Sequence, residues 1–160
     1  MQVDERAEAI EMLYRTRYGR FRDGVATITG DRESARDVVQ EAFARALRKR
    51  RTFRGEGSLE AWVWRIALRT AREHLRRVPG AISNGSVPAA LVEPDRDPAL
   101  AEALRALPAK RRLIVFLRYF ADLSYTQIAE ICEVSEGTVG ATLTQARAAL
   151  EEQLQEKGAT

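Results

Sequence analysis

Residues 53–77 read FRGEGSLEAWVWRIALRTAREHLRR, and this stretch decides the fold of the chain around it. A loop with Gly55 and Gly57 comes first. Ser58 follows as a predicted N-cap, because a serine hydroxyl can accept a hydrogen bond from a free amide of the first helical turn. No Gly or Pro follows until Pro79. The spacing of the apolar residues predicts a helix with one buried face, made of Leu59, Val63, Ile66, Ala67, Thr70 and His74.

The opposite face of this predicted helix combines one large aromatic residue with a row of cations. Arginines neutralise phosphates and an aromatic ring stacks on an unpaired base, so the combination favours binding of single-stranded nucleic acid. A second interpretation is that the tryptophan packs against a neighbouring helix and the arginines form a solvated surface. The residues on this face are Trp62, Arg65, Arg69, Arg72 and Arg76.

Charge is unevenly distributed along the 160 residues. The formal net charge is only +3, but residues 1–77 hold 18 Lys+Arg against 12 Asp+Glu. Residues 78–100 hold 1 against 3, and residues 101–160 hold 7 against 8. The basic half is therefore the N-terminal one, which indicates an anionic partner for that half.

Few residues are available for catalysis or metal binding. Cys132 is the only cysteine and His74 the only histidine, so the chain forms no internal disulfide and cannot assemble a zinc site from thiols. We therefore predict no metal, no cofactor and no enzymatic activity. The polar, acidic N-terminus and the absence of a long apolar run predict a cytoplasmic protein without membrane insertion.

Helical periodicity extends through the rest of the chain, and no strand-like alternation is seen. Residues 5–28 form a first helical pattern, and Asp31 is the predicted N-cap of a second, very regular one. Residues 78–98 hold four of the five prolines and predict a flexible linker. Beyond it, Ser124 and Ser135 are predicted caps of two short helices that form a helix-turn-helix pattern. The predicted fold is all-α: two small helical domains, the second a four-helix domain with a helix-turn-helix.

Short motifs in both halves carry a resemblance to a known family. In the first half they are DVVQEAF (37–43), FRGE (53–56), Trp62 and IA (66–67). In the second half they are LP (107–108), LSY (123–125), IAE (128–130), GTV (137–139) and AR (146–147). With these motifs in this order, the chain resembles the extracytoplasmic-function (ECF, group IV) sigma factors, the smallest specificity subunits of bacterial RNA polymerase.

The resemblance implies a role for each part of the chain. Residues 1–77 resemble sigma region 2, which binds core polymerase and recognises and melts the −10 promoter element. Residues 78–98 resemble the linker that threads toward the active-site channel, and residues 99–160 resemble region 4, which recognises the −35 element. The implied partners are the β and β′ subunits of core RNA polymerase, promoter DNA and an anti-sigma factor, with catalysis left to the polymerase.

The resemblance also implies three sets of binding residues. The core-polymerase set is Asp37, Gln40 and Glu41. The −10 set is Arg54, Ser58, Trp62, Arg65, Arg69, Arg72 and Arg76. The −35 set is Ser135, Glu136, Thr138, Val139, Thr142 and Arg147.

Several residues depart from the family pattern. Arg69 stands where the family usually has Asn, Glu73 where it has Asp, and Glu133 at a turn position usually held by Gly. Residues 140–145 lack the usual basic residues, which leaves Arg147 as the only cation of the recognition helix. These departures predict weak −35 binding, so one alternative is a sigma factor whose C-terminal domain needs an auxiliary protein. A further alternative is a stand-alone helix-turn-helix regulator that binds duplex DNA without polymerase.

Overall fold

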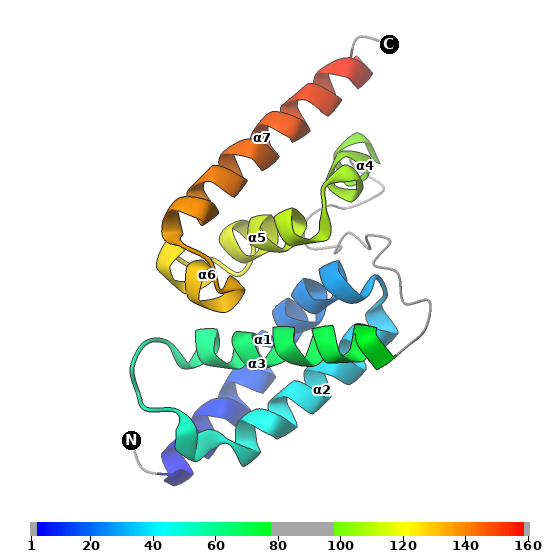
Figure 1. The fold of residues 1–160 in the computed structure, drawn as a ribbon. Coiled ribbons are helices and arrows are strands. Elements are labelled where there is room, and N and C mark those ends of the chain that lie inside the picture. Colours follow the sequence, from blue (N-terminus) through cyan, green and yellow to red (C-terminus); the bar gives the residue numbers. More distant parts are fainter. Residues whose placement is uncertain (1–2, 78–97, 159–160) are drawn as a thin grey trace.

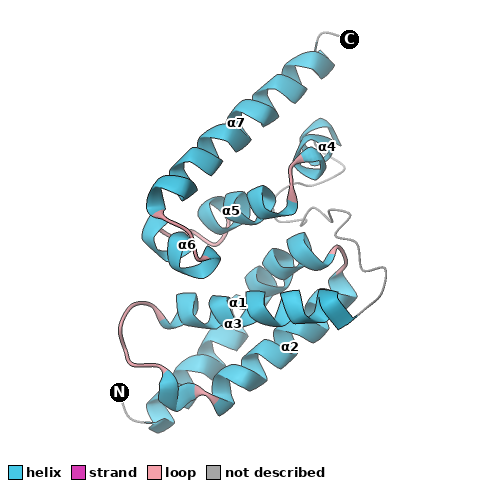
Figure 2. Cartoon of the chain, in the orientation of Figure 1, coloured by secondary structure: helices cyan, strands magenta, loops and turns pink. Residues whose placement is uncertain are grey.

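The structure, a computed structural model, describes residues 3–77 and 98–158 (Figure 1). Helices joined by short loops make up these residues, as Figure 2 shows, and the described part contains no strand. The all-α prediction is therefore confirmed. The predicted linker falls outside the described residues except for Pro98, which begins the fourth helix. The helices are α1 (Val3–Thr29), α2 (Arg32–Arg48), α3 (Leu59–Arg77), α4 (Pro98–Ala106), α5 (Ala109–Tyr119), α6 (Tyr125–Cys132) and α7 (Glu136–Gly158), with a 3-10 turn at Arg50–Thr52.

Polar caps set the start of four helices where the sequence predicts them. In each case a side-chain oxygen accepts a hydrogen bond from a backbone amide three residues later, which satisfies an amide that the helix itself leaves free. The α6 cap is a complete capping box, because Gln127 also accepts from the Ser124 amide. The oxygen-to-nitrogen distances are 2.7 Å for Asp31 to Ser34, 3.3 Å for Ser58 to Ala61, and 3.1 Å for both Ser124 to Gln127 and Ser135 to Thr138.

The N-terminal domain consists of α1, α2 and α3 packed around aromatic side chains. The ring of Trp64 on α3 is completely buried and stacks on Phe21 of α1 with centroids 4.1 Å apart. Phe43 of α2 meets Phe21 edge-to-face at 5.0 Å. Aromatic contacts of this kind stabilise a core beyond the area they bury, so these three rings fix the helices against one another.

The predicted buried face of α3 was only partly right. Val63, Ala67 and Thr70 are buried as expected, whereas Leu59, Ile66 and His74 are only half-buried. Four further residues of α3 are buried that the sequence pattern did not predict. The reason is that α3 contacts both α1–α2 and the C-terminal helix α6, so its buried surface is wider than a single stripe. The additional buried residues are Ala61, Trp64, Leu68 and Ala71.

The C-terminal domain is the predicted four-helix domain. Helices α4, α5 and α6 each pack against the long helix α7, which runs diagonally in orange and red in Figure 1. Val139, Leu143 and Ala146 of α7 are buried in this contact. The turn between α6 and α7 passes through Glu133, whose φ of 57° lies in the left-handed region. The two helices and this turn form the predicted helix-turn-helix.

The two domains share one hydrophobic core. Helix α5 packs on α1, and α6 packs on α3. Gly24 of α1 lies at the junction, where an added Cβ would be 2.5 Å from a carbon of the Trp64 ring and 3.0 Å from a carbon of the Phe116 ring of α5. No side chain fits there, so Gly24 permits the close approach of both domains.

We predict that Gly24→Ala destabilises the protein by about 1–3 kcal/mol, because the new methyl group overpacks the contact between Trp64 and Phe116. Gly19→Ala is the matched control on the same helix, since the nearest atom to its added Cβ is the end of the Arg22 side chain at 4.0 Å. It should stabilise the helix by about 0.5–1 kcal/mol. Urea unfolding of both variants measures the two effects; equal stabilisation by both would contradict the close packing at Gly24.

Candidate promoter and polymerase interface

Trp62 is held in place by the loop before α3. Its ring is half-buried against the core and lies 5.5 Å, centroid to centroid, from the ring of the buried Phe53, at an angle of 46°. Gly55 and Gly57 both have φ near +78° (78° and 77°), which lets the loop turn from Phe53 back into α3. The Trp62 ring therefore packs on Phe53 of the preceding loop, and the residue as a whole remains partly exposed.

The arginines of α3 differ in their exposure and partners. Arg65 is half-buried, whereas Arg69, Arg72 and Arg76 are exposed. The Arg69 guanidinium lies 3.1 Å from a carboxylate oxygen of Glu133 in the C-terminal domain. Arg54 is exposed in the preceding loop, and Ser58 is occupied as the cap of α3. Arg54, Ser58 and Trp62 thus lie at or before the start of α3. The remaining predicted −10 residues follow along the helix and form an arginine surface made of Arg65, Arg69, Arg72 and Arg76.

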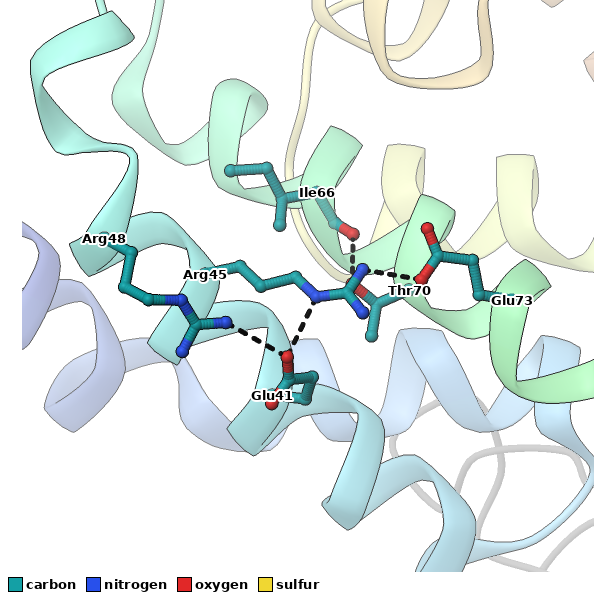
Figure 3. Close-up of polar contacts among 6 residues, drawn as sticks. All are labelled: Glu41, Arg45, Arg48, Ile66, Thr70 and Glu73. Carbon is teal, nitrogen blue, oxygen red and sulfur yellow. Dashed lines mark hydrogen bonds and ion pairs between the residues drawn. The ribbon is translucent and has the colours of Figure 1, made fainter. Parts of the chain in front are cut away.

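The predicted core-polymerase residues Asp37, Gln40 and Glu41 are all exposed on α2. Glu41 accepts hydrogen bonds from two arginines of the same helix, Arg45 at 2.9 Å and Arg48 at 3.2 Å. In Figure 3 the Arg45 side chain lies between Glu41 of α2 and Glu73 of α3, which it contacts at 2.7 Å. Helices α2 and α3 are therefore joined by one bridging arginine.

These contacts shift the pKa values of the three charged residues, Glu41, Arg45 and Glu73. The hydrogen bond from Arg45 holds the pKa of both Glu41 and Glu73 below its usual value, and the bond to Glu73 raises the pKa of Arg45. Arg45 also lies 3.4 Å from the Thr70 hydroxyl, which donates to the Ile66 carbonyl (Figure 3). Glu41 and Glu73 each stand out in the sequence for a different reason. Neither spacing nor motif shows that Arg45 contacts both of them.

An apolar hollow of about 370 Å³ lies beside Gln40, between α1 and α2. Phe43 and Leu47 of α2 line it from one side, and Ile10 and Tyr14 of α1 from the other. The first helical pattern of the sequence gave no sign of this hollow, because its residues look like ordinary core positions. The surface around Gln40 thus combines exposed polar groups with an apolar depression, as protein-binding surfaces do.

The predicted −35 residues lie around the start of α7, and most are engaged within the domain. Ser135 caps the helix through Thr138, and Glu136 accepts a hydrogen bond from the Thr126 hydroxyl at 2.7 Å. Thr142 is half-buried, one turn along. Val139 is completely buried, so it packs the core and presents no surface to DNA. This burial corrects its assignment to the −35 set.

Arg147, the only cation in residues 135–150, is bound to Tyr119 of α5. Its guanidinium donates to the Tyr119 hydroxyl at 2.6 Å from Nε and lies 5.5 Å from the centre of the ring. The interaction raises the pKa of Arg147 and directs the side chain toward α5. A phosphate contact by Arg147 would have to compete with this interaction.

Within residues 3–77 and 98–158, no three His, Cys, Asp or Glu side chains are grouped to hold a metal ion. In the same residues no helix is both long enough and apolar enough to cross a membrane. Cys132 is buried, and burial raises the pKa of its thiol to about 11. A thiol of this kind stays protonated near neutral pH and is a poor nucleophile.

Comparison with known families matches both domains. A family described as Sigma-70 region 2 matches residues 13–78, and a family described as Sigma-70, region 4 matches residues 98–150. The RNA polymerase sigma-H factor of Pseudomonas aeruginosa is 32% identical over 145 residues, which cover 78% of this chain and 75% of that protein. The ECF RNA polymerase sigma-E factor of Escherichia coli is 33% identical over 140 residues, covering 74% of this chain and 73% of that protein.

Two solved structures share the fold. The sigma factor RpoE from Bartonella quintana, crystallised with the anti-sigma factor NepR, has a TM-score of 0.63 and 23% identity, covering 84% of this chain and 89% of that one. CnrH, in complex with the cytosolic domain of CnrY, has a TM-score of 0.72 and 22% identity, covering 96% and 95%. Both are similar in fold at low sequence identity.

Region 2 followed by region 4 defines the class of the protein, which is that of bacterial sigma factors. With relatives above 30% identity over most of its length, this chain belongs to the ECF sigma factors. It therefore functions in transcription initiation with RNA polymerase, and the alternative of a stand-alone helix-turn-helix regulator is set aside.

The Arg45 bridge gives a prediction about pH. Carboxylates with a lowered pKa contribute stability above their unfolded pKa, and the contribution is lost as the pH falls through the folded pKa. Arg45→Gln should therefore be less stable than the unmodified chain at about pH 7, and the gap should narrow toward about pH 4 as Glu41 and Glu73 take up protons.

Urea unfolding at the two pH values measures this gap. Arg48→Gln is the control, because the Arg48 side chain is more exposed than that of Arg45. It pairs with Glu41 on its own helix, and no ion pair joins it to Glu73. Its effect on stability should be small at both pH values. A gap for Arg45→Gln that is independent of pH would contradict the ionic bridge.

Proposed function

We propose that α3 captures the unpaired non-template strand of the −10 element, with the arginine surface on the phosphates and Trp62 against an extruded base. Arg54 in the preceding loop would extend the basic surface, and Ser58 fixes the start of the helix. The observation that carries the proposal is the row of arginines beside a half-buried tryptophan, on a helix whose other side is locked in the core. Aromatic stacking and phosphate contacts of this kind are how proteins bind single strands.

The inner side of the Trp62 ring rests on Phe53, which keeps the ring in one orientation before DNA arrives. A ring held in place loses less freedom when a base stacks on it, so the packed state favours binding. Unstacking a base costs a few kcal/mol, and the stacking platform offsets that cost.

For the polymerase, we propose that α2 provides the docking surface through Asp37, Gln40 and Glu41. The apolar hollow beside Gln40 would receive side chains of a polymerase helix. The exposed polar residues around the hollow would fix the position of that helix along α2. Because Arg45 joins Glu41 to Glu73, docking on α2 and strand capture by α3 would act on one rigid unit. The β and β′ subunits of the cytoplasmic core enzyme are the expected partners.

In the C-terminal domain, we propose that Ser135, Glu136, Thr138 and Thr142 at the start of α7 face the −35 element. Arg147 would contribute only after leaving Tyr119. The −35 contact would therefore be weak, and a second candidate role for this domain is docking of an auxiliary protein. The fold relatives RpoE and CnrH were solved with NepR and with CnrY, respectively, and we propose that a partner of the anti-sigma kind also binds this chain.

The −10 proposal predicts that Trp62→Ala lowers the yield of open complexes by about tenfold, because a stacked base contributes about 1–3 kcal/mol. Closed-complex formation on duplex DNA should change little. Trp62→Phe should restore most of the open complexes, since phenylalanine also stacks. Permanganate footprinting of the melted strand, with core polymerase and a promoter found by run-off transcription, measures the open complex, and equal loss of open and closed complexes would contradict the stacking role.

The −35 proposal predicts that scrambling the −35 sequence reduces run-off transcription only several-fold while the −10 sequence is kept. The reason is that Arg147, the only cation in residues 135–150, is already bound within the domain. The converse change, a scrambled −10 sequence with an intact −35 sequence, is the control and should abolish transcription. Complete loss from the −35 change would show that α7 reads DNA strongly without assistance.

A further inference from the structure

The turn of the helix-turn-helix lies against the arginine surface of α3. Glu133, the C-cap residue of α6, reaches across the domain boundary to Arg69 at 3.1 Å. Both side chains remain more than half exposed, at 51% for Glu133 and 60% for Arg69. The contact is therefore a surface ion pair between the two domains, which water and salt can reach.

The Glu133 carboxylate faces several of the arginines proposed to bind DNA. Arg69 lowers the pKa of Glu133 most, through its hydrogen bond and its charge, and the charges of Arg72 and Arg65 lower it further. A second carboxylate of α6 lies nearby, since an oxygen of Glu130 is 3.7 Å from the position that a Cβ on Gly57 would take. Two acidic side chains of the C-terminal domain thus lie against the α3 surface and the loop before it.

The backbone at Glu133 is unusual for a residue with a side chain. Its φ of 57° and ψ of 46° are left-handed, a conformation that glycine adopts without strain and other residues adopt at a cost. A glutamate kept in this conformation calls for a compensating interaction. The exposed pair with Arg69 offsets only part of this cost, and Glu133 and Arg69 are two positions at which this chain departs from the family pattern.

We propose that Glu133 is an internal competitor for DNA phosphate, which occupies part of the arginine surface of α3 at Arg69 while the two domains are in contact. This inference rests on the proposed role of α3 in binding the −10 strand. The carboxylate places negative charge near Arg65, Arg69 and Arg72, where a phosphate of the captured strand would bind. A phosphate of single-stranded DNA must then displace the Glu133 carboxylate before it pairs with Arg69.

The barrier set by the ion pair is small. Exposed ion pairs contribute little individually and weaken as salt screens them. The pair therefore selects against weak, non-specific DNA contacts by the free protein, whereas a correct −10 strand presented on polymerase displaces it.

The test measures binding of a fluorescent oligothymidylate to the full chain by anisotropy. Glu133→Gln keeps the size of the side chain and removes the competing charge, so it should bind about threefold more tightly at low salt. The advantage should shrink as salt is raised. Glu152→Gln is the matched control, because it removes the same charge from an exposed position on α7.

Glu133→Gly provides a second variant, in which the left-handed position no longer carries a side chain. It should melt at a higher temperature and also bind the oligonucleotide more tightly. Equal affinity of the unmodified chain, Glu133→Gln and Glu133→Gly would overturn the competition while leaving DNA binding by α3 intact. Absence of binding by all variants would instead contradict the −10 role itself, and the competition with it.

Discussion

Burial of the Trp64 ring is the interaction on which the rest of the structure depends. The ring is fully buried, stacks on Phe21 of α1 and passes so close to Gly24 that no side chain fits between them. Phe116 of α5 meets the same glycine from the C-terminal domain. One aromatic side chain of α3 therefore joins α3 to α1 and, at Gly24, lies where α5 of the second domain approaches.

The position of Trp64 also determines which side of α3 is free. A helix turns by about 100° per residue, so fixing residue 64 in the core turns residues 62, 69 and 76 to the far side and places residues 65 and 72 on the flank. Trp62 and the arginine surface follow from this rotation. The proposed function of α3 thus depends on the buried Trp64, which orients the helix, as well as on Trp62, which is proposed to contact DNA.

The sequence was sufficient for the helices, their caps and the row of arginines, because these depend on local spacing and on single side chains. It was insufficient for contacts between helices. The buried face of α3 was misjudged since a periodic pattern does not tell how many neighbours a helix has, and Trp64 was missed for this reason. Two contacts join residues that are distant in sequence: the hydrogen bond between Arg147 and Tyr119, and the Arg45 bridge to Glu73. No sequence motif predicts either of them. Arg69 and Glu133 could each be recognised as departures from the family, but only the structure shows that they contact each other.

The contact at Gly24, Trp64 and Phe116 holds the two domains of the free chain together, and we propose that core polymerase separates them and so frees Arg69 from Glu133. The most direct measurement is the distance between spin labels at Thr16→Cys and Glu156→Cys, two exposed positions in different domains, with the buried Cys132 left unlabelled. The proposal predicts a single, narrow distance distribution in the free protein and a longer distance when core RNA polymerase is bound. The same distance in both states would contradict it.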